Sequence, residues 1–130
     1  MKILAIDYGR RKLGLAVSDG SLASPYKVLK VGVWEEVFQQ VGAIAQKLDV
    51  ERLLVGVSEG EMAKEQREFA SNLSKRLKVP VILWDETLST KDAVEKSIQA
   101  GVKREKRRKK EDSFAAAVIL QNYLDSSLKS

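Results

Sequence analysis

The stretch ILAIDYGRRKLGLAVSD, residues 3–19, holds two apolar runs on either side of a short polar segment. These runs predict β-strands over about residues 2–7 and 13–19, because short apolar runs bounded by turn residues are typical of buried strands. The few residues between them include Gly9, and such a short connection favours an antiparallel hairpin. Asp7 ends the first run, so the stretch predicts a carboxylate at the tip of a buried strand.

The rest of the chain alternates between strand-like and helix-like patterns. The segment YKVLKVG predicts a third strand over about residues 26–32, after the loop-like GSLASP. Beyond it, apolar residues recur at helical spacing, at Val37, Val41, Ile44 and Leu48. The later elements are expected to be a strand at 52–57, a helix at 61–77, a strand at 79–84, a helix at 89–101 and a final helix that begins at Asp112.

This order of elements predicts the fold class. Three strands in a meander, followed by strand–helix–strand crossovers, imply a mixed five-stranded α/β sheet with helices on both faces. The length fits one domain over residues 1–130, and the only linker-like piece is the basic run at 102–111. Asp112 is expected to be the N-cap of the final helix, since an Asp directly before an apolar periodic run is typical of a helix start.

The residue types that are missing exclude several classes of chemistry. The chain has no cysteine and no histidine, which excludes disulfides, thiolate metal sites, Ser–His triads and imidazole-bound zinc. An enzyme of this composition would depend on carboxylates, hydroxyls, Lys, Arg or a hard metal ion. No apolar run reaches the roughly 18 residues of a membrane span and no secretory signal is seen, so we expect a cytoplasmic protein with no membrane partner.

The net charge of +5 is concentrated in one part of the chain. Residues 101–110, GVKREKRRKK, hold seven cations and one anion, whereas the remaining residues hold 16 cations and 17 anions. A local basic run favours a polyanionic partner such as nucleic acid, and a solvated loop is the other interpretation. With 6% aromatic residues, the sequence does not indicate a base-stacking platform. The candidate phosphate-binding residues are Arg10, Arg11, Lys12, Lys103, Arg104, Lys106, Arg107, Arg108, Lys109 and Lys110.

Acidic residues stand at the ends of several predicted elements. They are Asp7 after the first strand, Glu59 and Glu61 after the fourth, Asp85 and Glu86 after the fifth, and Asp112 at the final helix. In open α/β sheets, ligands gather beyond the carboxyl ends of the strands. If the acids converge there, Mg²⁺ would offset their mutual repulsion, because it prefers oxygen ligands. A pair of such ions can promote phosphodiester hydrolysis without histidine.

Each acid also has a purely structural interpretation. Asp7 is a suitable turn residue before Gly9, and Asp112 is a suitable N-cap. Asp85 and Glu86 fit a solvated loop, while acids after the fourth strand fit the first turn of a helix. The set is more informative than any single member, because all of its positions depend on one topology.

Four segments together resemble the YqgF family, also called RuvX, of ribonuclease H-like proteins. They are ILAIDYGRRKLGLAVSD, LLVGVSEG, VPVILWDETLSTKDA and DSFAAAVILQNYLD, and they span nearly the whole chain. The resemblance implies a ribonuclease H-like fold in which the sheet has the order 3-2-1-4-5 with strand 2 antiparallel. The chain departs from the usual family pattern at Ser58, where proline is common, and at Thr87, where arginine is common.

The resemblance also implies an activity and the residues for it. It indicates a metal-dependent endonuclease that processes the 5′ end of precursor 16S ribosomal RNA, with Mg²⁺ or Mn²⁺ held by acids. By position, Asp7, Glu86 and Asp112 would be the catalytic and metal-binding residues, with Asp85 a less favoured ligand. Water would attack phosphorus and leave a 5′-phosphate and a 3′-hydroxyl.

Two other functions stay open from the sequence. The same acids would serve a Holliday junction resolvase on four-way DNA, which needs paired sites and therefore a dimer. The cations alone would serve a non-catalytic assembly factor that binds ribosomal RNA. The expected partner is therefore nucleic acid, either precursor ribosomal RNA or branched DNA, and the expected state is a monomer or a weak dimer.

Overall fold

The computed structural model describes the backbone of residues 2–58, 60–85 and 104–128, and the side chains of these ranges except 104–112 and 127–128. Five strands form one sheet in the order β3-β2-β1-β4-β5, in which β2 is antiparallel to its neighbours and β4 and β5 run parallel to β1. The predicted mixed sheet and its strand order are confirmed. The strands are β1 (Ile3–Tyr8), β2 (Lys12–Asp19), β3 (Leu22–Lys30), β4 (Arg52–Val57) and β5 (Val81–Asp85).

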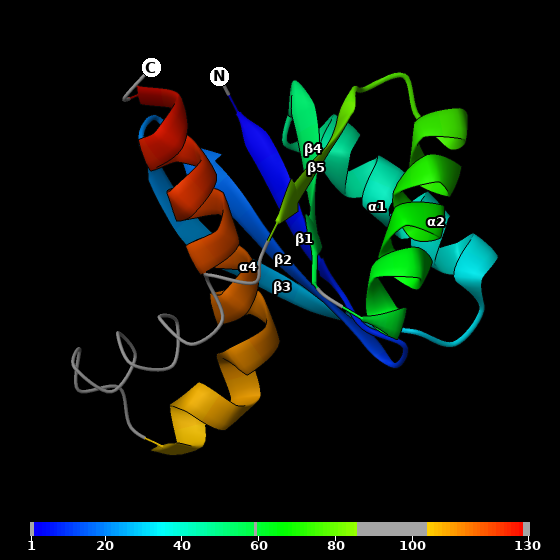
Figure 1. Ribbon diagram of the computed structural model, residues 1–130, viewed down its shortest axis with the longest axis horizontal. Helices are drawn as coiled ribbons and strands as arrows, with labels where there is room; N and C mark the ends of the chain where they lie inside the picture. The colour runs from blue at the N-terminus through cyan, green and yellow to red at the C-terminus, as the bar shows by residue number, and fades with distance from the viewer. Residues whose placement is uncertain (1, 59, 86–103, 129–130) are drawn as a thin grey trace.

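Helices cover both faces of the sheet (Figure 1). The helices α1 (Trp34–Lys47) and α2 (Glu61–Arg76) pack on one face, close to the predicted bounds. The helix α4 (Arg104–Leu128) packs on the other face. The helix predicted at 89–101 lies outside the described residues. No helix within the described ranges carries an apolar stretch long enough to cross a membrane.

The start of α4 corrects one prediction. The helix begins at Arg104, so Asp112 is an interior helical residue and not the N-cap, and most of the expected linker at 102–111 is helical. The physical reason is that Lys, Arg and Glu are good helix formers, and no Gly or Pro interrupts residues 104–128. The basic run is therefore continuous with the apolar helix that follows it.

The third strand also differs from its prediction. β3 spans Leu22–Lys30 instead of 26–32, and it pairs with β2 through a register shift at Leu15/Ala16. Pro25 is tolerated because β3 is an edge strand, where a missing donor need not face a partner. The backbone N–H of Ala23 donates to the Gln121 side chain of α4 at 2.9 Å, a contact that local sequence patterns cannot reveal.

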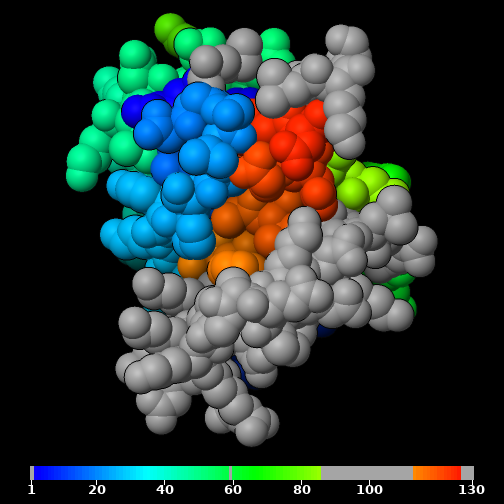
Figure 2. All heavy atoms as spheres, turned by 90° about the vertical axis from the view of Figure 1, so that its left-hand side faces the viewer, coloured from blue at the N-terminus to red at the C-terminus, as the bar shows by residue number. Residues whose placement is uncertain are grey.

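The alternation of side chains along β1 divides the core into two clusters. Leu4 and Ile6 pack with α1 and α2, whereas Ile3 and Ala5 pack with α4. Asp7 follows in the same alternation and therefore belongs to the α4 face of the sheet. Figure 2 shows this side of the molecule, on which α4 lies alongside the blue residues of β2 and β3.

Gly9 marks the tight turn after β1. A Cβ at this position would lie 2.7 Å from the backbone oxygen of Lys12, which is closer than any real side chain allows. Glycine is therefore required for the hairpin that follows Asp7. The opposite end of β1 is held by Ser18, whose buried hydroxyl accepts a hydrogen bond from the Ile3 N–H at 2.8 Å.

Candidate active site

Asp7 is half-buried at the carboxyl end of the central strand, with glycine on both sides of it in the sheet. Its partner on β2 is Gly14. On β4, Gly56 comes directly after Val55, which pairs with Ile6. Neither neighbour has a side chain beside the Asp7 carboxylate. A glycine inside a strand often marks the close approach of a ligand or of another backbone, and both of these glycines are buried.

The N-terminal half of α4 passes this position. Arg52, which pairs with Ile3, donates a hydrogen bond to the Tyr123 hydroxyl at 3.2 Å, and α4 runs antiparallel to β1 (Figure 1). Asp7 lies four residues beyond Ile3, or about 13 Å along the strand. At about 1.5 Å per helical residue, this distance leads back roughly nine residues along α4 from Tyr123, to the vicinity of Ser113.

Ser113 and Asp112 thus lie on the part of α4 that faces the end of β1. Ser113 is only 4% exposed, and α4 packs on the sheet from Ala116 onward. The backbone of Asp112 directly precedes it, while its side chain lies outside the described residues. Glu86 and Glu59 are also outside the described residues, as is Lys103.

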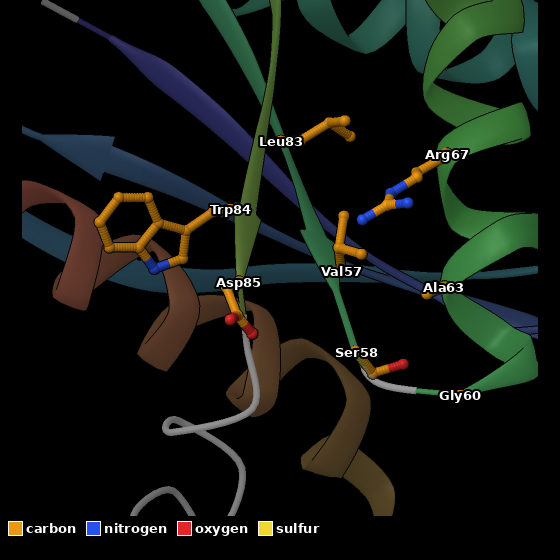
Figure 3. A pocket seen from close by; sticks show the side chains of 8 residues that line it. All are labelled: Val57, Ser58, Gly60, Ala63, Arg67, Leu83, Trp84 and Asp85. Carbon is orange, nitrogen blue, oxygen red and sulfur yellow. The ribbon is translucent and has the colours of Figure 1, made fainter.

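Asp85 does not share a face with Asp7. Ile82 and Trp84 of β5 pack on the α4 side. The rings of Trp84 and Tyr123 meet edge to face, with 5.3 Å between their centroids. Leu83 alternates to the α2 side (Figure 3), and Asp85 follows Leu83 in this alternation. Among the side chains that the structure describes, no three acids form a group that could hold a metal ion. The alternation places Asp85 on the α2 side and Asp7 on the α4 side. The convergence of Asp7 with Glu86 and Asp112, and a ligand role for Asp85, stay predictions.

A cavity of about 390 Å³ opens beside these strand ends. It is lined by residues of β4, β5 and α2, namely Val57, Ser58, Gly60, Ala63, Arg67, Leu83, Trp84 and Asp85 (Figure 3). The buried Gln66 holds the lining residue Ser58, because its Oε1 accepts hydrogen bonds from the Ser58 N–H at 2.7 Å and the Ser58 hydroxyl at 3.1 Å. Gly60 precedes α2 with a φ of 84°, a conformation that favours glycine.

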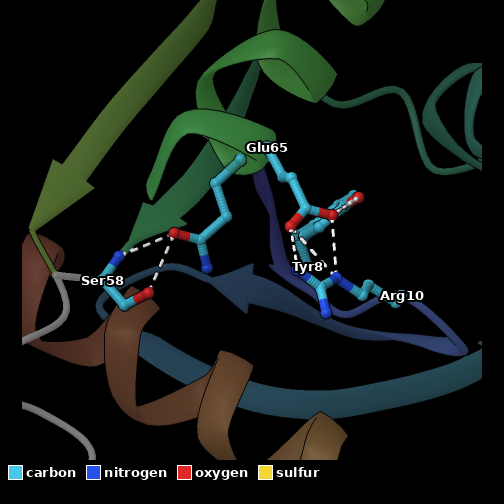
Figure 4. Close-up of polar contacts among 5 residues, drawn as sticks. Tyr8, Arg10, Ser58 and Glu65 are labelled. Atoms are coloured by element: carbon cyan, nitrogen blue, oxygen red, sulfur yellow. Dashed lines mark hydrogen bonds and ion pairs between the residues drawn. The ribbon is translucent and has the colours of Figure 1, made fainter. Parts of the chain in front are cut away.

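A polar network fixes the hairpin tip on the other face of the sheet (Figure 4). The Nε–H of Arg10 donates to both carboxylate oxygens of Glu65 at 3.0 Å, and the Tyr8 hydroxyl donates to the same carboxylate at 3.3 Å. Hydrogen bonding from Arg10 lowers the pKa of the Glu65 carboxyl. Burial, followed by the charge of Glu65, raises the pKa of the Tyr8 phenol. Arg10, predicted as a phosphate contact, is thus paired with Glu65, while Arg11 and Lys12 are exposed at the tip.

An aromatic cluster next to this network was not predicted. Tyr8 stacks on Trp34 at 5.5 Å between ring centroids. Phe69 packs against both of these rings, and Phe38 packs against Trp34 and Phe69. The cluster lines a second cavity of about 310 Å³, together with Glu65, Glu68 and Asn72. Its members come from β1, α1 and α2, so no spacing in the sequence brings them together.

The Glu65 network predicts a pH-dependent contribution to stability. Because the Glu65 pKa is lowered on folding, its contribution is complete above the pKa of the unfolded state and is lost as the pH falls through the folded value. We expect Glu65→Gln to lower the melting temperature at neutral pH and the difference from the wild type to vanish in acid. Thermal melts over a pH series test this. A difference that stays constant at every pH would contradict it.

Comparison with known proteins places the chain in a family. Residues 1–126 match the RuvX family, described as "Holliday junction resolvase". A relative from Halothermothrix orenii is 38% identical, covering 96% of this chain and 95% of its own length. Another relative, from Geobacillus thermodenitrificans, is 39% identical, and the match covers 97% of this chain and 99% of the relative. Both carry the name "Putative pre-16S rRNA nuclease".

Solved structures share the fold at low sequence identity. RuvC from T. thermophilus in complex with a Holliday junction substrate has a TM-score of 0.65 and 17% identity, covering 98% of this chain and 96% of that one. The Fowlpox virus resolvase with Holliday junction DNA also has a TM-score of 0.65, at 15% identity, and the match covers 98% of this chain and 99% of the resolvase chain. These likenesses confirm the ribonuclease H-like fold. With the family match over nearly all of its residues, the chain belongs to the RuvX family.

Proposed function

We propose that the protein is a metal-dependent endonuclease that hydrolyses phosphodiester bonds in structured RNA, and that it processes the 5′ end of precursor 16S ribosomal RNA in ribosome biogenesis. One observation carries the proposal: Asp7 stands at the carboxyl end of the central strand, paired with Gly14, on the face of the sheet that α4 covers. The names of the curated relatives support the choice of RNA as the substrate.

Asp7, Glu86 and Asp112 are the proposed ligands of Mg²⁺ or Mn²⁺. The donor chemistry fits, because carboxylate oxygens are the ligands that these hard ions prefer. The neighbouring strands also present no side chain at Gly14, the partner of Asp7, or at Gly56, which follows the partner of Ile6. A bound divalent ion would supply polarisation of a phosphoryl oxygen and activation of the attacking water.

The protein's own residues bring the phosphodiester to this place. α4 carries six of the seven Lys and Arg residues of the basic run, at positions 104–110, and Lys103 precedes it in the sequence. The backbone that bears these six residues is therefore helical in the turns before Asp112. Such a run attracts a nucleic acid backbone and makes binding weaken steeply with salt. A cytoplasmic location and a monomer or weak dimer are part of the same proposal.

Cleavage of two end-labelled substrates tests the proposed function. We expect the wild-type protein to cut precursor 16S RNA with Mg²⁺ or Mn²⁺ and to leave it intact with a chelator. A four-way DNA junction of similar length should be cut much more slowly under the same conditions. Faster cutting of the junction would favour a resolvase instead. Binding of the RNA without a metal-dependent product would favour a non-catalytic assembly factor.

A further inference from the structure

Arg67 is an arginine without an ion-pair partner among the described residues, and it lines the 390 Å³ cavity between α2 and the ends of β4 and β5. Two other arginines near α2 are already engaged: Arg10 pairs with Glu65, and Arg76 pairs with Glu35 at 2.7 Å. The Arg67 side chain is exposed and extends from α2 toward the cavity (Figure 3). Its guanidinium is therefore available to an anion.

The other walls of the cavity differ in chemistry from Arg67. Val57 and Leu83 provide an apolar surface between α2 and the strands, and Leu83 is 46% exposed although it is a large apolar residue. Asp85 lies at the end of β5, on the far side of the cavity from Arg67 (Figure 3). A ligand that fits this arrangement has an anionic group at one end and a hydrogen-bond donor at the other, joined by a compact apolar body.

The cavity lies close to Asp7 in the sheet. Gly56 of β4, which follows the partner of Ile6, pairs with Trp84 of β5, and Trp84 lines the cavity. Since adjacent strands are about 4.8 Å apart, β5 is about 10 Å from the strand that carries Asp7. The cavity is on the α2 face and Asp7 is on the α4 face, but both lie toward the carboxyl ends of their strands. A nucleic acid strand with one phosphate at Asp7 would therefore have to cross this edge of the sheet to place a nearby nucleotide in the cavity.

We propose that this cavity is a subsite for one ribonucleotide of the substrate strand, next to the phosphate that is cut. Arg67 binds the phosphate of that nucleotide, because its planar guanidinium matches phosphate in geometry and charge. Asp85 accepts a hydrogen bond from the ribose 2′-hydroxyl, the group that distinguishes RNA from DNA, and Val57 and Leu83 contact the sugar. The inference rests on the proposed nuclease function and adds a source of RNA preference to it.

The phosphate contact is tested with Arg67→Gln. Its control is Lys75→Gln, which removes the same charge from an exposed residue about 12 Å further along α2. Binding of a fluorescent single-stranded RNA would be measured by anisotropy in chelator, over a series of salt concentrations. We expect Arg67→Gln to weaken binding about tenfold. It should also make the slope of log K against log salt shallower by about 0.7. Lys75→Gln should change neither quantity.

The ribose contact is tested with Asp85→Ala on RNA and DNA of the same sequence. We expect about a tenfold loss of RNA affinity and little change for DNA. Chelator removes metal from the comparison, so a role for Asp85 beside an ion cannot produce this difference. Equal changes for RNA and DNA would overturn the ribose contact. Circular dichroism melts would show that each variant is folded at the temperature of the assay.

The outcomes separate this inference from the proposed function. One outcome is that the wild type binds RNA with a clear salt dependence while Arg67→Gln behaves like Lys75→Gln. In that case the proposed subsite is wrong, and the proposed nuclease function is unaffected. If the wild type binds neither RNA nor DNA at low salt, the proposed function fails. A shallower slope for Arg67→Gln alone, with RNA-specific loss for Asp85→Ala, supports the subsite.

Discussion

Asp7→Asn is expected to lower the rate of metal-dependent RNA cleavage on the order of 10³-fold. The substitution keeps the shape of the side chain and removes its negative charge. A divalent ion lowers the activation free energy by several kcal/mol when it stabilises the transition state. If the variant binds that ion weakly, most of this stabilisation is lost. Affinity for RNA in chelator should stay within a few-fold of the wild type, because the basic residues are unchanged. Single-turnover cleavage and anisotropy measure the two quantities separately.

The control for this variant is Asp19→Asn. Asp19 is an exposed acid at the end of β2, and its strand pair places it at the opposite end of the sheet from Asp7. Both variants remove one negative charge from the same small protein, so a general electrostatic effect on RNA binding would be shared. Cleavage by Asp19→Asn should match the wild type. Equal losses in both variants would mean that Asp7 has no special part in the chemistry.

Leu120→Ala is expected to lower the free energy of unfolding by about 2–5 kcal/mol. Leu120 is fully buried where α4 packs on Ile3, Ala5 and Leu54. The small alanines of α4 let the helix approach the sheet closely, so a truncated leucine leaves a cavity that the surroundings cannot fill. Because α4 also positions Asp112, we expect activity to fall at temperatures where the variant begins to unfold.

Leu22→Ala is the matched control for this loss. Leu22 is 66% exposed at the start of β3, so the same atoms are removed from a site that water already reaches. Its free energy of unfolding should stay within about 0.5 kcal/mol of the wild type. Urea denaturation of both variants gives the comparison. Similar losses at the two positions would mean that the α4 face does not form the core described above.

The sequence was sufficient for most of the sheet because its patterns are local. The apolar runs at β1, β2 and β4 and the helical spacing of α1 and α2 each report burial by neighbouring elements. Contacts between segments far apart in the chain could not be predicted from these local patterns. Gln121 satisfies the Ala23 backbone 98 residues earlier, and this contact helps β3 to begin at Leu22.

The candidate site was predictable in part for the same reason. Asp7 at a strand end follows from one short run, but its glycine neighbours depend on the register of three strands. The faces of Asp7 and Asp85 also depend on the structure of the sheet, since both acids are near strand ends and the alternation of side chains assigns their faces. The stack of Tyr8 on Trp34 needs the packing of α1 against β1, which no spacing in the sequence specifies.

Paramagnetic broadening by Mn²⁺ tests most directly whether Asp7 marks a metal-dependent centre. Amide signals of an isotope-labelled sample would be followed by NMR during titration with substoichiometric Mn²⁺. The proposed site predicts that the signals of Tyr8, Gly14 and Gly56 broaden first, and that Asp7→Asn abolishes this broadening while Asp19→Asn preserves it. Broadening that is centred away from the end of β1, or that persists unchanged in Asp7→Asn, would contradict the assignment.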